Sequence, residues 1–311
     1  KKMVPIIAFI VPFLILYVLY PDSYNLMWKG RAFYFFFMWL LFMEILINWD
    51  RITVGRLTEI KSAKTFAFIV AAILPILYIM TANYFGLNNA LMDVARSYAV
   101  VPDFVQFVPL FIEYFVFVGL FTLILSTYYG IRQISNFALS MIFLAAIGAL
   151  YMIDTLYPWG LFTPFQILVP TTTQLSASVL NMMGYKTSIA MTLIPNEGIL
   201  PILTVQDLYG HTAVYAVAWV CSGIESLIIF SVTIPLFFKN SGIPWKQRLV
   251  YFIFGAAVTY FINALRIATI FIIALNGGDW NAFHNFYGML YSMSWIVSTW
   301  WLDSLASVRE E

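Results

Sequence analysis

Long apolar runs dominate the pattern of hydrophobic and polar positions along the chain. Eight of them have the length and composition of a membrane-spanning helix, which needs about 20 apolar residues. The predicted spans are residues 3–20, 32–48, 64–82, 103–127, 134–154, 213–238, 248–275 and 284–302. A further apolar stretch, 164–182, is interrupted by Pro170 and the polar residues 171–174. This stretch could cross the membrane, re-enter it or lie in the interface.

The distribution of Lys and Arg decides between these topologies, because cytoplasmic loops carry an excess of positive charge. With the N-terminus in the cytoplasm and 164–182 outside the bilayer, eleven of the 16 basic residues lie inside and four outside. Arg266 is left within a span. A crossing at 164–182 would invert every later loop and move Lys239, Lys246 and Arg248 to the outside. The charges therefore favour eight spans with both termini in the cytoplasm.

The segment 155–212 is then the largest external element. Residues 187–194 and 199–205 alternate like strands around the turn sequence Pro-Asn-Glu-Gly at 195–198. Pro201 predicts that the second strand lies at an edge, because proline cannot donate to a ladder.

The predicted fold is an all-α integral membrane protein, a bundle of about eight transmembrane helices with a small external hairpin cap. We expect a single membrane domain over 1–311. Its parts are five N-terminal spans in 1–154, an external interfacial helix and hairpin in 155–212, and a three-span core in 213–302.

Composition narrows the class of function. The chain has 311 residues, of which 62% are hydrophobic and 10% charged, against about 45–50% and about 25% in soluble domains. This excludes an ordinary soluble enzyme and a disordered chain. The net charge of +1 gives no sign of a nucleic-acid partner. The single cysteine cannot form an intramolecular disulfide, and we expect no cofactor and no metal.

Polar groups inside the predicted spans are the first candidates for function, because an intramembrane charge is costly. These are Glu44, Glu113, Asp154, Cys221, Glu225, Asn263, Arg266 and His284. Counting 20 residues from the cytoplasmic ends of the last three spans puts Cys221, Arg266 and His284 at the same outer boundary. Three reactive residue types thus reach one level of the membrane, although spacing alone does not show that they touch.

Together these three residue types form a workable acyl-transfer set. A Cys221 thiolate would be the nucleophile, His284 would move protons, and Arg266 would donate hydrogen bonds to a developing oxyanion. Asn263 lies three residues before Arg266 on one helix face and could hold it. Glu225 lies four residues after Cys221, on the same face of the predicted helix, and could pair with Arg266 or orient His284.

Each candidate also has a structural interpretation. A lone Cys in a membrane helix is usually a small apolar filler, a boundary Arg extends its charge to the interface, and a His at a helix start caps it. His211, just outside the span, is the rival to His284 as base. For Glu44 and Glu113 we expect structural pairing or an interfacial position.

Three sequence blocks resemble the exosortase/archaeosortase family. Residues 217–226, Val-Ala-Trp-Val-Cys-Ser-Gly-Ile-Glu-Ser, resemble its Ala-x-x-Cys-Ser-Gly block. Residues 263–266, Asn-Ala-Leu-Arg, resemble its Asn-x-x-Arg block, and Phe-His at 283–284 followed by Gly288 resembles its His block. The family usually carries a basic residue soon after Cys-Ser-Gly, where this chain has Glu225.

The resemblance implies a membrane-embedded cysteine transpeptidase. Its partners would be secreted proteins that end in a short motif, a hydrophobic helix and a basic tail. Cleavage near the motif would leave a thioester on Cys221, and an amine, such as that of a lipid headgroup, would take the acyl group. Two other classes stay open: a transporter that binds an anionic substrate at Arg266, and a non-enzymatic membrane assembly subunit.

Overall fold

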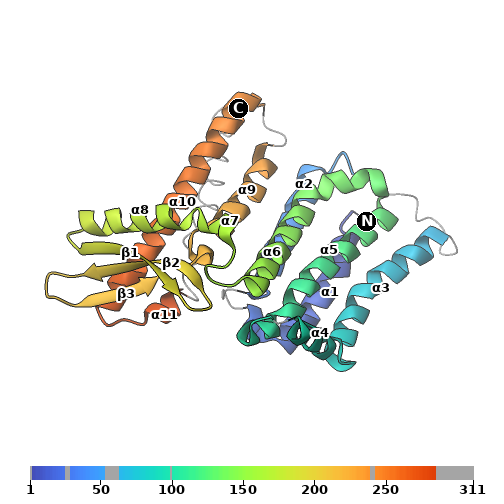
Figure 1. The fold of residues 1–311 in the computed structure, drawn as a ribbon. Coiled ribbons are helices and arrows are strands. Elements are labelled where there is room, and N and C mark those ends of the chain that lie inside the picture. Colours follow the sequence, from blue (N-terminus) through green and yellow to red (C-terminus); the bar gives the residue numbers. More distant parts are fainter. Residues whose placement is uncertain (1, 25–28, 53–62, 99, 239–241, 285–311) are drawn as a thin grey trace. The chain divides into compact units, whose positions relative to one another are not determined.

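The computed structural model describes residues 2–24, 29–52, 63–98, 100–238 and 242–284. The chain divides into two compact units, and the boundary falls between Leu156 and Tyr157 (Figure 1). The first unit is helical. Its α-helices are α1 (Val4–Leu19), α2 (Phe33–Ile47), α3 (Ala63–Tyr84), α4 (Leu87–Ser97), α5 (Val108–Tyr128) and α6 (Ala138–Leu156). Its short 3-10 helices are η1 (Pro21–Tyr24), η2 (Pro102–Phe107) and η3 (Ile131–Phe137).

Four of the described helical segments are long and apolar enough to cross a membrane. They are Ala63–Tyr84, Pro102–Tyr128, Ile131–Leu156 and Trp245–Leu275. The apolar helices Val4–Leu19, Phe33–Ile47 and Ile224–Leu236 are shorter. The chain is a multi-pass membrane protein, and the total of eight spans stays a prediction. The predicted span 284–302 lies, apart from His284, outside the described residues.

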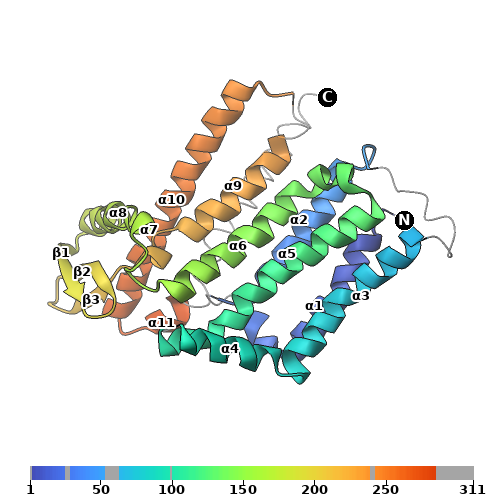
Figure 2. The same cartoon turned by 45° about the vertical axis from the view of Figure 1, so that its right-hand side comes forward.

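Aromatic packing holds the first unit together. Helix α5 packs against α3 and α6, and α2 against α6, as the two views show (Figures 1 and 2). Between them lie fully buried rings such as Phe9, Tyr34, Phe117 and Phe121. Phe9 meets Phe121 edge to face at 5.4 Å between ring centroids, a favoured geometry for aromatic pairs. Many apolar side chains on α3 face outwards instead, as expected for a helix that contacts lipid.

The second unit combines helices with a small antiparallel sheet. It contains α7 (Thr163–Gln166), α8 (Val169–Met182), β1 (Lys186–Ile194), β2 (Gly198–Gln206), β3 (Thr212–Ala216), η4 (Trp219–Cys221), α9 (Ile224–Phe238), α10 (Trp245–Leu275) and α11 (Trp280–Ala282). The strands lie in the order β1-β2-β3. Helix α8 packs on β1 and β2 and also against α10, which packs against α9 (Figures 1 and 2).

The predicted hairpin is confirmed. Residues Lys186 to Ile194 pair with Gln206 to Gly198 around the expected turn. The expectation that Pro201 confines β2 to an edge is wrong, because β2 is the central strand. The Pro201 carbonyl accepts a hydrogen bond from Val217 N at 2.9 Å. In an antiparallel ladder the N–H and C=O groups of one residue point to the same side, so the N–H that proline lacks would also have faced β3. Pro201 therefore removes no hydrogen bond between β2 and β1.

The predicted helix 213–238 is also wrong over residues 213–223. Residues 212–216 form β3, and helix α9 begins only at Ile224. A continuous apolar run does not by itself distinguish a buried strand from a helix. Here β2 offers a partner for every β3 residue, and Gly223 has a φ of +90°, which a right-handed helix does not accommodate. Helix α8, with 14 residues, is not among the segments long enough to span.

Candidate active site

Cys221 is the last residue of the single-turn 3-10 helix η4, in the tight turn between β3 and α9, and not part of an α-helix. Only Ser222 and Gly223 separate it from the first residue of α9. The expected placement of Glu225 one helical turn along the same face as Cys221 is therefore wrong. Because the N-terminal end of a helix carries partial positive charge, the start of α9 favours a negative charge at this turn.

Two groups from other helices hold the cysteine turn in place. From α10, Asn263 donates its Nδ2 hydrogen to the Cys221 carbonyl at 2.9 Å. A Cβ on Gly223 would lie 3.0 Å from the Asn263 side chain. Glycine is therefore required here by its positive φ and by this close approach.

From α8, the Thr172 hydroxyl lies 3.2 Å from the Ser222 carbonyl and 2.6 Å from the Tyr260 hydroxyl. Tyr260 in turn donates to the Leu168 carbonyl at 3.0 Å. Thr172 is fully buried, so this polar contact joins α8 and α10 to the cysteine turn. Thr172 is a site residue that was not predicted from the sequence. The available signal was the polar run at 171–174 inside an otherwise apolar stretch.

Arg266, in the C-terminal half of α10, lies close to His284, which follows α11. The Arg266 guanidinium donates to the His284 backbone carbonyl at 3.3 Å. No ion pair within 4.0 Å joins Arg266 to Glu225 in the described part of the chain. The structure thus links Cys221, through Asn263 and one turn of α10, to Arg266 and His284.

Several buried polar atoms at this site have no hydrogen-bond partner in the described part of the chain. They are Oε1 of Glu225, Oδ1 of Asn263 and Nε of Arg266. Buried polar atoms in folded proteins are normally hydrogen-bonded. The two acceptors and one donor left here are available to groups outside the described residues.

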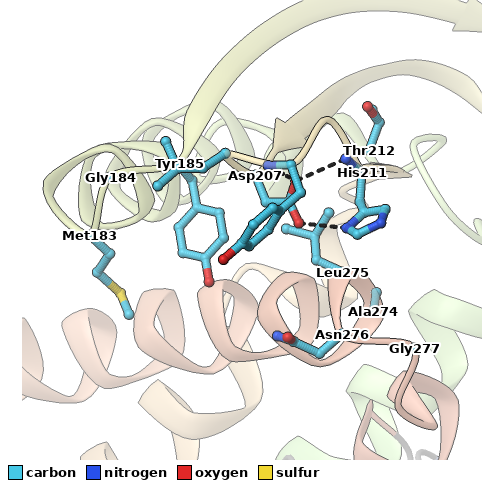
Figure 3. Close-up of a pocket in the computed structure, with 12 residues that line it drawn as sticks. Met183, Gly184, Tyr185, Asp207, His211, Thr212, Ala274, Leu275, Asn276 and Gly277 are labelled. Carbon is cyan, nitrogen blue, oxygen red and sulfur yellow. Dashed lines mark hydrogen bonds and ion pairs between the residues drawn. The ribbon is translucent and has the colours of Figure 1, made fainter.

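His211, the rival base, lies at the other end of β3. It occupies the turn between β2 and β3, where its Nδ1 is 2.7 Å from Asp207 Oδ2 (Figure 3). Asp207 also accepts from the backbone N–H groups of Tyr209 and His211. Desolvation raises the pKa of the Asp207 carboxyl group, but the hydrogen bonds from His211 and Tyr209 outweigh it and lower the pKa overall.

Strand β3 separates this turn from the cysteine. Its five residues extend about 17 Å at 3.3 Å per residue. The sequence analysis did not identify Asp207, although its spacing of four residues from His211 across Gly210 is typical of a side chain that closes a turn.

The turn that holds His211 borders a pocket of about 870 Å³. The pocket lies between the end of α8, the β2–β3 turn and the C-terminal end of α10 (Figure 3). Its polar side chains include Tyr185, Asp207, His211 and Asn276, whereas Cys221, Arg266 and His284 do not line it. The pocket and the cysteine turn are therefore two separate features of this unit. Among the described residues, no three His, Cys, Asp or Glu side chains lie close enough to share a metal ion.

The carboxylates of the first unit have structural partners, as expected for Glu44 and Glu113. Both Glu113 oxygens accept from Arg31, at 2.7 and 2.8 Å. Glu44 accepts from the backbone N–H groups of Leu139 and Ser140 at 3.0 Å, at the start of α6, where a negative charge is favoured.

Asp154 forms a buried ion pair with Lys29 at 2.8 Å. Burial lowers the pKa of the Lys29 amine, and Asp154 opposes that change. These carboxylates therefore connect segments of the first unit.

Comparison with known proteins identifies the family. The family model described as transmembrane exosortase (Exosortase_EpsH) matches residues 90–301. This region includes all three blocks that carry Cys221, Arg266 and His284. No curated protein and no solved structure gave a significant match. Since the family model covers more than half of the chain, the chain belongs to the transmembrane exosortase family, whose members are membrane sorting enzymes of the cysteine transpeptidase type.

Proposed function

We propose that this protein cleaves the C-terminal sorting signal of exported proteins through a thioester on Cys221 and transfers the product to an amine, that of a membrane lipid. The observation that carries the proposal is the link from the Cys221 turn through Asn263 to Arg266 and His284. These two hydrogen bonds support a site formed by three residues from separate sequence blocks of the second unit. Their chemistry matches the activity type of the family.

The cleavage step follows from these positions. The Cys221 thiolate attacks the carbonyl carbon of the scissile peptide bond, and the carbonyl oxygen becomes an oxyanion that accepts hydrogen bonds from Arg266. When the C–N bond breaks, His284 protonates the leaving amine. The exported protein is then held as a thioester on Sγ, and the hydrophobic tail is released.

The transfer step is the same chemistry in reverse order. The acceptor amine attacks the thioester carbonyl, His284 takes the proton that this nitrogen loses, and the C–S bond breaks to return the thiolate. One amide bond is broken and one is formed, so the reaction needs no oxidant, reductant or nucleotide. Asn263 acts as a positioning residue, because it holds the Cys221 carbonyl.

The test is loss of processing with retention of fold. Cys221→Ala should abolish cleavage of a secreted reporter that carries the C-terminal motif, helix and basic tail of an exported protein from the same source. Its thermal unfolding should match wild type, because removing one small side chain costs little packing. Cys221→Ser should be nearly as inactive, and His284→Ala should lose most of the activity. Full processing by Cys221→Ala would exclude covalent catalysis and favour a non-enzymatic role.

The distribution of Lys and Arg indicates on which side of the membrane the site lies. With eleven basic residues inside and four outside, both termini lie in the cytoplasm and the Cys221 turn lies at the extracytoplasmic face. A tail helix in the bilayer would then bring its scissile bond to the same boundary. Cysteines placed at Glu197 and Gln247 in a Cys221→Ala background should be labelled by an impermeant reagent from outside only at residue 197. External labelling at residue 247 would overturn this topology.

A further inference from the structure

Strand β3 is an edge strand that leads to the proposed nucleophile. In the three-stranded sheet it pairs with β2 alone. Beyond Ala216 the chain stays beside β2, since Val217 N donates to the Pro201 carbonyl. It then enters the turn that contains Cys221. The free side of β3 therefore continues directly to the catalytic turn.

The backbone groups on that free side can be identified from the register. The Pro201 carbonyl points towards β3. Backbone groups alternate in direction along a strand, so those of Leu203 and Val205 also point towards β3, where they pair with Tyr215 and Ala213. In an antiparallel ladder the intervening residues direct their N–H and C=O groups away from the partner strand.

On β3 these intervening residues are Thr212, Val214 and Ala216. All three are exposed, Val214 by 53%. The structure gives their outward backbone groups no partner within the described residues. Strand β3 has no proline, no charge and no bulge on this side, the features that usually protect an edge from pairing.

We propose that the exported protein binds as an added strand along β3, with the residues just upstream of its scissile bond paired to Thr212, Val214 and Ala216. This inference rests on the proposed function and names how its substrate is held. The substrate must reach Cys221 as an extended chain before its hydrophobic tail helix begins. An edge strand whose end adjoins the nucleophile satisfies that need with main-chain hydrogen bonds.

The direction of the added strand follows from that of β3. Strand β3 runs towards Cys221, and the upstream part of the substrate also runs towards the scissile bond, so the two strands are parallel. The five residues of β3 match a substrate segment of about five residues. Affinity from main-chain bonds depends little on side-chain identity, which suits an enzyme whose substrates are different exported proteins.

The opposite edge of the same sheet provides a matched control. Strand β1 is also an edge strand, but β2 separates it from β3, and its ends join Tyr185 and the turn at 195–197. Ile189 is paired opposite Leu203, whose groups face β3, so Ile189 directs its N–H away from the sheet. Val214→Pro and Ile189→Pro thus each remove one backbone N–H that points away from the sheet at an edge strand.

The experiment compares Val214→Pro with Ile189→Pro. Each should fold, because neither substitution removes a ladder hydrogen bond. With the secreted tail reporter, Val214→Pro should lower kcat/KM about tenfold, mainly through KM, as expected for lost main-chain bonds. Ile189→Pro should leave kcat/KM unchanged. Labelling of Cys221 by a small thiol reagent should be equal in both variants and in wild type.

Wild-type kcat/KM in a folded Val214→Pro, while Cys221→Ala is inactive, would overturn strand addition and leave the proposed function intact. If Val214→Pro fails to fold, photocrosslinking decides instead. With p-benzoylphenylalanine in place of Val214 or Ile189 in a Cys221→Ala background, the reporter should crosslink to position 214 and not to 189. Crosslinking at 189 alone, or at neither position, would equally reject the proposal.

Discussion

The two units of the molecule treat their buried charges in opposite ways. In the first unit Glu113 accepts two hydrogen bonds from Arg31, and Asp154 pairs with Lys29. In the second unit, beside the Cys221 turn, Glu225 and Arg266 each keep a buried polar atom without a partner in the described part of the chain. A buried charge with a partner holds two segments in one relative position. A buried polar atom without a partner lowers the stability of the fold, and such groups are concentrated at functional sites. The comparison separates structural charges from candidates for catalysis.

The largest effect on stability is expected from breaking a pair in the first unit. Glu113→Gln should destabilise the protein by about 3–5 kcal/mol, because it leaves the Arg31 charge buried without its partner. Thermal unfolding in detergent measures this effect. The matched control is Asp93→Asn, which breaks an exposed ion pair with Arg96 and should cost under about 1 kcal/mol. Equal small losses in both variants would mean that the buried pair does not hold the first unit together.

Replacing Arg266 in the second unit should reduce the rate and spare the fold. Arg266→Lys keeps the charge but not the planar fork of donors, so cleavage should slow by at least about 100-fold. Single-turnover cleavage of the tail reporter by wild type, Arg266→Lys and Arg266→Ala measures this. Asn263→Ala should show part of the defect, since it releases the Cys221 carbonyl. Near-wild-type cleavage by the Lys variant would reduce Arg266 to a simple charge.

A smaller effect should follow from loosening the cysteine turn. Thr172→Val removes the hydroxyl beside the Ser222 carbonyl and should cost about 1–3 kcal/mol, because that buried group loses a partner. Cleavage should slow several-fold, mainly in kcat. The control is Thr173→Val, whose hydroxyl donates to the Val169 carbonyl of its own helix. If both variants cleave alike, Thr172 does not position the turn.

The smallest effect is expected at the histidine that lies far from Cys221. His211→Ala should cleave the reporter within about twofold of wild type, because β3 separates it from Cys221 by about 17 Å. The pKa of Asp207 should rise, since the substitution removes the main hydrogen bond that lowers it. NMR titration of the Asp207 carboxyl carbon measures the change. A large loss of cleavage with His284→Ala still active would transfer the role of base to His211.

The membrane class and the hairpin could be predicted from the sequence because each depends on local patterns, whereas the roles of Cys221, Arg266 and His284 stay predictions. Apolar runs set the helices, and four of the eight predicted spans correspond to helical segments long and apolar enough to cross a membrane, those of α3, α5, α6 and α10. Alternation around the Pro-Asn-Glu-Gly turn at 195–198 sets the hairpin, because strand period and turn geometry are properties of neighbouring residues. The spacing of Asn263 and Arg266 on one helix needs no tertiary information either.

What only the tertiary structure decided concerns residues whose partners are distant in sequence. The apolar pattern of β3 is equally compatible with a helix. This segment forms a strand because it pairs with β2. Because this segment is a strand, Cys221 lies in a turn contacted by Asn263 and Thr172 and not in the predicted membrane helix. The sequence by itself determined which residue types and local elements exist. Their contacts were decided by folding, because hydrogen bonds between separate elements depend on distances in space that no local pattern encodes.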